Sequence, residues 1–443
     1  MAQQKLPVWV LLKLGLFHVG SAMIDLLVVS IWNRVMIVEL GVPATPVGLV
    51  TSLPNFLMPL FVWGGYLSDE RPILGLRRLP YALGGRLVMV APFFVLPVIG
   101  WGIARGEPLW WLAALVAFII FGVGRAVSGT AYLALIHDRA PEAQRGRALG
   151  FVWLMLIIGF STMSILYGRL LPDYDPVTYQ RLFIVAPLVA LVLVVIALWG
   201  EEKPRTQTEV AEEEKTRVPL SAALRVVWDN PPARIFAAFL FVSALFMFAY
   251  DQILEPFGGD VFGLPVGITT RWNAYWGVGV LLGMISLLAI TGRKRRPRDT
   301  AITAVGTVGI SLAFAVLTYA SVASVQAAVV PGIMLLGLSM GTFNVGGLAL
   351  MMRMSDPRLA GTFLGMWSLM QLMGRGFSGL LGASIRDAVV MLTGGDYALA
   401  YGLAFAVEAI GVAAALWLLL RLNIEQFTQT VRVRAAEVFA AVD

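Results

Sequence analysis

The sequence predicts an all-α polytopic membrane protein with 12 transmembrane helices, arranged as two related sets of six. Hydrophobic residues make up 58% of the 443 positions and charged residues only 14%, against about 25% in soluble domains. The hydrophobic residues gather in runs of about 20, the length that crosses the hydrocarbon core as a helix. The basic residues fall mostly in every second gap between these runs.

The runs follow one another along the whole chain. Each is expected to be helical, because a helix satisfies its own backbone hydrogen bonds inside lipid. The first run is too long for the apolar core of a signal peptide, and no small-residue cleavage site follows it, so we expect a retained first helix. The runs begin near Val8, Pro46, Leu79, Leu109, Ala148, Leu182, Arg234, Val266, Thr300, Gln326, Ala360 and Tyr397.

The distribution of basic residues predicts the orientation in the membrane. Of the 33 Lys and Arg residues, 24 lie in one set of gaps and six in the other, and Arg86, Arg125 and Arg375 lie within or at the edge of runs. The positive-inside rule then predicts that both termini are cytoplasmic. The basic stretch 293–298 is a short loop between two runs, so we interpret it as a topology anchor rather than a nucleic-acid site.

One long polar stretch divides the chain. Its low apolar content predicts a flexible cytoplasmic linker between two six-helix halves. The predicted parts are an N-terminal half (1–199), the linker (200–232), a C-terminal half (233–424) and a cytoplasmic tail (425–443).

The two halves are related in sequence. A shift of 215 residues, without a gap, aligns Gly122 to Gly159 with Gly337 to Gly374 and gives 10 identities in 38 positions. The aligned element is a helix–loop–helix formed by runs four and five and by runs ten and eleven. A parallel six-plus-six duplication predicts this relation.

The loop after the second run carries a motif. Residues 65–69 read Gly-Tyr-Leu-Ser-Asp, and Arg77 and Arg78 follow. This motif resembles the loop motif of the major facilitator superfamily. The resemblance implies a cytoplasmic latch, in which Gly65 permits close helix approach and Asp69 meets a helix N-terminus or a loop arginine.

A narrower resemblance is to the PucC/LhaA family of phototrophic bacteria. Residues 33–44, Asn-Arg-Val-Met-Ile-Val-Glu-Leu-Gly-Val-Pro-Ala, are similar to that family and absent from superfamily transporters in general. Further similar blocks lie within 68–81, 128–153 and 350–376, so the resemblance covers most of the chain. The chain departs from the family pattern at His137 and Arg139, and in carrying Arg125 within the fourth run.

This resemblance implies a function in assembling light-harvesting complexes, by holding or delivering bacteriochlorophyll or a precursor. The expected partners are the lipid bilayer, light-harvesting antenna polypeptides and pigment-biosynthesis enzymes, with no nucleic acid. The expected location is the bacterial inner membrane, cytoplasmic or photosynthetic intracytoplasmic. Two other functions stay open: a proton-coupled transporter of a small solute, and a scaffold that binds antenna polypeptides without pigment.

Polar side chains within the runs are costly and are therefore candidate functional residues. His18 and Asp25, seven residues apart, share one face of the first helix. In the superfamily, helices one, four, seven and ten line the central cavity, which makes His18, Asp25, Arg125 and Asn344 the candidate cavity or pigment-binding set. His18 is either an axial ligand to a pigment magnesium or a histidine hydrogen-bonded between helices. His137 is expected to be an exposed loop residue.

A second candidate is an ion pair inside the membrane between Arg375 and Glu408, on consecutive helices. Such a pair would be either structural or a proton-linked switch. An enzyme is not expected, because the chain lacks a phosphate-binding Gly-x-x-x-x-Gly-Lys-Ser/Thr motif. A protein-bound metal centre is not expected either, since the chain has two histidines and no cysteine.

Overall fold

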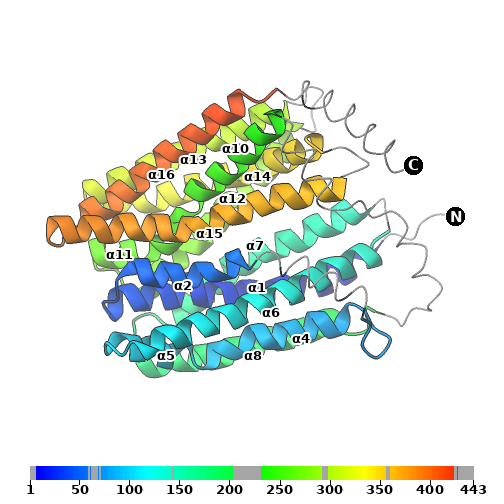
Figure 1. Ribbon diagram of the computed structural model, residues 1–443, viewed down its shortest axis with the longest axis horizontal. Helices are drawn as coiled ribbons and strands as arrows, with labels where there is room; N and C mark the ends of the chain where they lie inside the picture. Colours follow the sequence, from blue (N-terminus) through cyan, green and yellow to red (C-terminus); the bar gives the residue numbers. More distant parts are fainter. Residues whose placement is uncertain are drawn as a thin grey trace. The chain divides into compact units, whose positions relative to one another are not determined.

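The protein is helical throughout the part of the chain that its structure, a computed structural model, describes (Figure 1). The described residues are 6–57, 60, 68, 71–141, 144–202, 231–291, 298–355, 360–423 and 427. Within these ranges the extended pairing is one isolated bridge, between Ile73 and Leu76. The predicted all-α class is therefore confirmed.

The helices of the first 202 residues begin close to the predicted positions. They are α1 (Val8–Leu26), its π-helical continuations η1 (Leu27–Trp32) and η2 (Val35–Glu39), α2 (Ala44–Phe56), α4 (Leu79–Val90), η3 (Ala91–Phe94), α5 (Leu96–Ala104), α6 (Leu109–Arg139), α7 (Arg145–Leu170) and α8 (Pro176–Leu198).

The later helices follow the same pattern. They are α10 (Pro231–Met247), η7 (Ala249–Gln252), α11 (Leu254–Phe262), α12 (Val266–Thr291), α13 (Asp299–Val322), η8 (Gln326–Ala328), α14 (Val329–Arg353), α15 (Ala360–Thr393) and α16 (Tyr397–Leu420).

Nine helical stretches among the described residues are long and apolar enough to cross a membrane, which confirms a multi-pass membrane protein. The other three predicted runs, near Pro46, Val266 and Ala360, correspond to α2, α12 and α15. The count of 12 spans stays a prediction. The nine stretches are Val8–Glu39, Leu79–Ala104, Leu109–Arg139, Arg145–Leu170, Pro176–Leu198, Pro231–Gln252, Asp299–Val322, Gln326–Arg353 and Tyr397–Leu420.

The chain forms two compact units. The first comprises residues 1–206 and 251–277, and the second residues 207–250 and 278–443. The segment that follows α10 therefore groups with the first unit, a long-range association that no run of apolar residues indicates. The predicted domain boundaries stay a prediction.

The same helix pairings occur inside each unit, as a duplication requires. In the first unit α1 packs on α7 and α8, and α4 packs on α6; in the second, α10 packs on α15 and α16, and α13 on α14. A methyl group added at Gly159 of α7 would crowd Val19 of α1, and one added at Gly374, 215 residues later, would crowd Phe241 of α10. The two aligned glycines thus have equivalent packing positions.

Two helices begin at carboxylate caps. The Asp175 carboxylate accepts a hydrogen bond of 2.8 Å from the backbone N–H of Thr178 at the start of α8, and Asp396 accepts one of 2.9 Å from Leu399 at the start of α16. Hydrogen bonds from Thr178 hold the pKa of the Asp175 carboxyl below its ordinary value.

Candidate functional site

One face of α1 carries a row of polar side chains inside the first unit. His18, Ser21 and Asp25 lie three and seven residues apart, which places them on the same side of the helix. The Nη2 of Arg125, on α6, lies 3.5 Å from the Oδ2 of Asp25. The structure therefore brings two of the predicted cavity residues, Asp25 of α1 and Arg125 of α6, into an ion pair about two helical turns along α1 from His18.

Arg86 of α4 joins this row, although the sequence argument left it out of the candidate set. Its side chain is 2% exposed, and its Nη2 donates a 2.9 Å hydrogen bond to Ser21. Its Nη1 lies 3.2 Å from the sulfur of Met89, and its guanidinium carbon lies 4.2 Å from the centre of the Phe17 ring. Its Nε is buried without a hydrogen-bond partner among the described residues. The sequence did contain a sign that Arg86 belongs to the candidate set, because a single arginine within an apolar run is costly in lipid.

His18 is surrounded by aromatic rings rather than by hydrogen-bonding groups. Its ring centre lies 5.1 Å from that of Tyr132, edge to face, and 5.5 Å from that of Trp153. Both ring nitrogens are buried and make no hydrogen bond within the described part of the chain. The alternative of a histidine hydrogen-bonded between helices therefore finds no partner among the described residues, whereas the lone pair of a neutral imidazole stays available for a ligand.

The remaining intramembrane candidates lie in the second unit. Asn344 is on α14 with an exposed side chain. The guanidinium carbon of Arg375, on α15, lies 4.2 Å from the centre of the Phe248 ring. Glu408, on α16, is 1% exposed. The ion pair between Arg375 and Glu408 stays a prediction.

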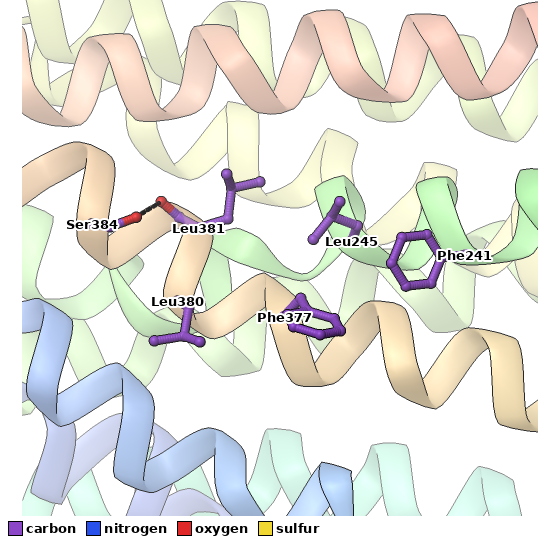
Figure 2. A pocket seen from close by; sticks show the side chains of 6 residues that line it. All are labelled: Phe241, Leu245, Phe377, Leu380, Leu381 and Ser384. Atoms are coloured by element: carbon purple, nitrogen blue, oxygen red, sulfur yellow. Dashed lines mark hydrogen bonds between the residues drawn. The ribbon is translucent and has the colours of Figure 1, made fainter.

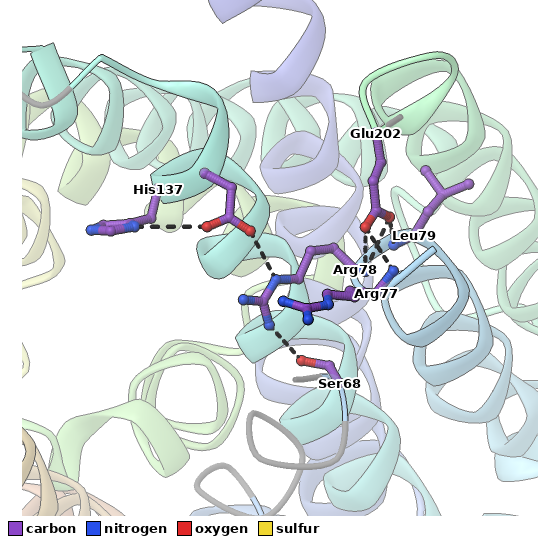
Figure 3. A network of polar contacts seen from close by, with 7 residues as sticks. Ser68, Arg77, Arg78, Leu79, His137 and Glu202 are labelled. Carbon is purple, nitrogen blue, oxygen red and sulfur yellow. Dashed lines mark hydrogen bonds and ion pairs between the residues drawn. The ribbon is translucent and has the colours of Figure 1, made fainter. Parts of the chain in front are cut away.

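The predicted loop motif is described only in its second part, because Gly65 and Asp69 lie outside the described residues. The backbone N–H groups of Arg77 and Arg78 donate hydrogen bonds of 2.7 and 2.9 Å to the carboxylate of Glu202. Figure 3 shows these contacts. The N–H of Leu79 donates to the same carboxylate at 2.6 Å. Glu202 therefore caps the N-terminus of α4, the interaction with a helix end that the motif's resemblance had assigned to Asp69.

The side chain of Arg78 links three segments of the first unit. Its Nε donates to Asp138 of α6 at 3.0 Å, and its Nη1 donates to Ser68 at 2.7 Å (Figure 3). His137, expected in a loop, instead lies in the last turn of α6; it is exposed, and its Nδ1 is 3.9 Å from Asp138. The helix extends this far because Arg78 and the last turn of α6 are held together.

Glu201 is anchored as well, although the sequence placed it in a flexible linker. Its carboxylate lies 2.8 Å from Nζ of Lys13 and 3.0 Å from Nε of Arg139, and its side chain is 3% exposed. Lys13 also donates to the backbone carbonyl of Trp199. The polar stretch therefore begins with two residues fixed to the helix bundle, because two cations compensate the buried carboxylate. The rest of the predicted linker, 203–230, lies outside the described residues.

The first part of the segment that carried the narrower family resemblance, residues 33–37, is buried and helical. Asn33 donates a 2.7 Å hydrogen bond to the carbonyl of Gln252, and Arg34 donates one of 2.9 Å to the carbonyl of Leu264. Arg34 also lies 3.1 Å from Glu39. The helix continues through η1 and η2 because residues 252–264 provide partners for these polar groups.

Further buried polar contacts tie the same region together. Glu255 accepts a 2.7 Å hydrogen bond from Asn273, whose amide lies 3.4 Å from Ser30. Thr51 donates to the side chain of Gln252 at 3.0 Å. The π-helical geometry at Leu27–Glu39 coincides with this network, as π segments often do at functional positions.

Two apolar grooves lie on the surface of the units, one on each. In the second unit, a groove of about 390 Å³ lies between α10 and α15. The residues that line it, drawn in Figure 2, are Phe241, Leu245, Phe377, Leu380, Leu381 and Ser384. In the first unit, a groove of about 530 Å³ lies along η3, α5 and α6 and includes Trp110. Both are lined almost wholly by carbon, so they suit acyl chains, isoprenoid chains or apolar helices.

The chain is similar in sequence to proteins of phototrophic bacteria over most of its length. A family model described as PUCC protein matches residues 31–427. Protein PucC of Rhodovulum sulfidophilum is 32% identical over 400 residues, which cover 88% of this chain and 87% of that protein. A Rhodobacter capsulatus protein named bacteriochlorophyll synthase 44.5 kDa chain is 33% identical over 410 residues, 90% of this chain and 91% of that protein.

Solved structures with a similar fold are transporters. A bacterial homologue of the human lysosomal transporter Spinster, inward-facing and occupied, superposes with a TM-score of 0.73 at 14% identity, covering 95% of this chain and 98% of that one. The nucleoside transporter NupG gives a TM-score of 0.68 at 14% identity, covering 94% and 100%. At such identities the likeness concerns the fold alone, and it confirms the expected major-facilitator-like fold.

Proposed function

This chain belongs to the PUCC protein family, and on that premise we propose that it is a membrane factor for the assembly of bacterial light-harvesting complexes. In this function it binds bacteriochlorophyll or a precursor and passes it to antenna polypeptides. The name of one relative, bacteriochlorophyll synthase 44.5 kDa chain, associates that protein with this pigment. The transporter-like fold is compatible with handling a small molecule inside the bilayer.

The observation that carries the proposal is the environment of His18. When bound, the pigment would supply a magnesium ion, and the neutral imidazole of His18 would hold it. His18 has the required nitrogen lone pair, because neither ring nitrogen is engaged by a described residue. The edge of Tyr132 and the indole of Trp153 pack around the imidazole and exclude water from it. A buried nitrogen without a hydrogen bond is costly, so a ligand that coordinates it would stabilise the site.

Transfer to antenna polypeptides needs an apolar surface within the bilayer. The two grooves described above provide such surfaces, and the exposed leucines, valines and isoleucines along α8 provide a further one. In this mechanism the protein holds the pigment through His18 while the antenna helix lies in lipid beside it. No nucleotide or covalent step is needed.

The test is a comparison of pigment content among three forms of the protein purified mildly from a phototrophic host. The chain has two histidines, so His137→Ala is a matched control for His18→Ala. We expect the wild type and His137→Ala to retain pigment in near-stoichiometric amount, seen in the absorption spectrum and in solvent extracts, and His18→Ala to lose it. Size-exclusion chromatography checks that each variant remains folded.

Other results would redirect the proposal. Pigment retained by His18→Ala would keep the carrier function and remove His18 as the ligand. Absence of pigment from all three forms, with antenna polypeptides still copurifying, would overturn the carrier and favour a scaffold.

A proton-coupled transporter is the second candidate, and the Asp25–Arg125 pair favours it. A carboxylate inside membrane helices can either bind a proton or, when ionised, pair with a neighbouring arginine, and it can alternate between these two states. In that case solute uptake into proteoliposomes would stop when the proton gradient is collapsed, and no pigment would bind.

A further inference from the structure

We infer that the ligand of the first unit is an acid: a magnesium tetrapyrrole with a free carboxylate, rather than the corresponding isoprenoid ester. This inference rests on the proposed function and specifies the substrate class of the same site. Its basis is an unbalanced pair of arginines beside His18.

His18, Asp25, Arg86 and Arg125 form a polar cluster in the first unit, and the charges in this cluster do not cancel. Arginine side chains such as those of Arg86 and Arg125 carry a positive charge in proteins, and Asp25 is the carboxylate that the described residues place beside Arg125. Asp25 is engaged by Arg125 at 3.5 Å, whereas the hydrogen bonds of Arg86 within the described part of the chain go to neutral groups, Ser21 and Met89. One positive charge is therefore in excess within membrane helices, where an uncompensated charge is expensive.

Arg86 has capacity for a further acceptor. Its Nε is buried and has no hydrogen-bond partner among the described residues, while the guanidinium is held in place by Ser21 and by the Phe17 ring. A guanidinium fixed in this way is preorganised for a carboxylate, which accepts two hydrogen bonds from the planar fork. A carboxylate on the ligand would balance the excess charge and occupy this donor.

The spacing along α1 suits one ligand that uses both ends of the cluster. His18 and Asp25 are seven residues apart, about 10 Å along the helix axis. Arg86 contacts Ser21 between them and lies close enough for its charge to act on His18. A magnesium tetrapyrrole held at its metal by His18 would present a peripheral carboxylate to these guanidinium groups. The imidazole and the guanidinium groups can therefore engage the metal and the carboxylate of one molecule.

The cluster is accessible on one side. On the other side, the Tyr132 side chain is held in place beside His18, because it is buried and its hydroxyl donates a 2.7 Å hydrogen bond to the carbonyl of Leu14. Trp153 is 51% exposed and Arg125 is 38% exposed. A ligand arriving on the accessible side would displace the indole from the imidazole and meet Arg125 without rearranging the buried core.

An ester would fit this site less well for an electrostatic reason. Esterification removes the negative charge, so the excess cation and the Arg86 donor would remain uncompensated. Sites built to bind a charged group discriminate strongly against analogues that lack it, because their own buried groups are then left unpaired.

The experiment is a binding titration of the purified full chain in detergent with two probes. One probe is a magnesium chlorin with a free propionate, and the other is the methyl ester of the same compound. Binding is followed by the absorbance shift of the chlorin and by quenching of tryptophan fluorescence. We expect the acid to bind roughly tenfold or more tightly than the ester, which corresponds to at least one charged hydrogen bond.

Four variants, one of them a control, separate the contributions. Arg125→Gln should reduce the preference for the acid while leaving ester binding unchanged, and Arg105→Gln, an exposed arginine outside the cluster, should change neither. Asp25→Asn removes the competing carboxylate and should increase the preference. His18→Ala should weaken both probes alike.

The outcomes distinguish this inference from the proposed function. Equal affinity of the wild type for acid and ester would overturn the inference and leave the pigment carrier intact. An acid preference that survives Arg125→Gln and does not respond to Asp25→Asn would also overturn it. Failure of both probes to bind would overturn the carrier and, with it, the inference.

Discussion

At the scale of single residues, two adjacent glutamates at the end of α8 bind different partners. Glu201 accepts from Lys13 and Arg139, whereas Glu202 accepts from the backbone N–H groups that begin α4. Their separation arises because consecutive side chains after a helix end point in different directions. Together they connect the end of α8 to α1, α4 and α6, so one pair of acidic residues fixes one end of the first unit.

Replacing Glu202 by alanine should destabilise the first unit by about 1–2 kcal/mol, since three N–H groups at the start of α4 lose their acceptor and its favourable charge. The measurement is thermal unfolding of the purified protein in detergent. Asp173→Ala is the control, because Asp173 is exposed, and its midpoint should remain near that of the wild type. Equal midpoints for both variants would show that Glu202 contributes no cap.

At the scale of helices, close packing of α4 on α6 places the charged cluster. A methyl group added at Gly124 of α6 would collide with the backbone of Met89 and Gly85 in α4, and Ser128 donates a 2.8 Å hydrogen bond to the carbonyl of Ala82. Because the two backbones approach this closely, Arg86 of α4 and Arg125 of α6 lie near the same stretch of α1. Small residues at helix interfaces allow such an approach in membranes.

Gly124→Ala should therefore separate α4 from α6 and destabilise the protein by about 1–3 kcal/mol, the usual range for overpacking. Gly129→Ala, on the same helix, is the matched control, because open space surrounds its added methyl group. That control should be neutral or stabilising by about 0.5–1 kcal/mol, since alanine favours helix over glycine. Denaturant or thermal unfolding of both variants gives the comparison, and equal destabilisation would contradict the proposed contact.

At the scale of the whole molecule, the topology follows from helices that cross once each. α8 runs from Pro176 to Leu198, about 34 Å, which is close to the thickness of the hydrocarbon core. Asp173 precedes this helix, and Glu202 follows it at the start of α4. Ile73 lies just before α4, so Asp173 and Ile73 belong to opposite ends of the first unit.

The natural chain has no cysteine, so single cysteines can report this topology directly. We expect Asp173→Cys to react with a membrane-impermeant maleimide in intact spheroplasts and Ile73→Cys to react only after the membrane is permeabilised. The reason is the excess of basic residues on the side of Ile73. The unmodified chain, which has no cysteine, is the control for non-specific labelling. The reverse labelling pattern would invert the predicted orientation, and labelling of both from one side would contradict a single crossing between them.

The fold class, the positions of the apolar helices, the duplication and the residues whose charges are costly in lipid could all be predicted from the sequence alone. These properties are local, because hydropathy and helix length are read along a short stretch of chain, and they anticipated α1 to α16 closely. The sequence also indicated His18, Asp25 and Arg125, since isolated polar groups are conspicuous in apolar runs.

Only the tertiary structure decided which groups meet. Glu202 and Leu79 are 123 positions apart, and Asn33 and Gln252 are 219 apart, so no periodicity connects them. The inclusion of Arg86 in the cluster depends in the same way on how closely α4 approaches α1 and α6. Partners are chosen by packing between distant segments, and the energy of a buried charge depends on those partners, which is why the arrangement of the site required the fold.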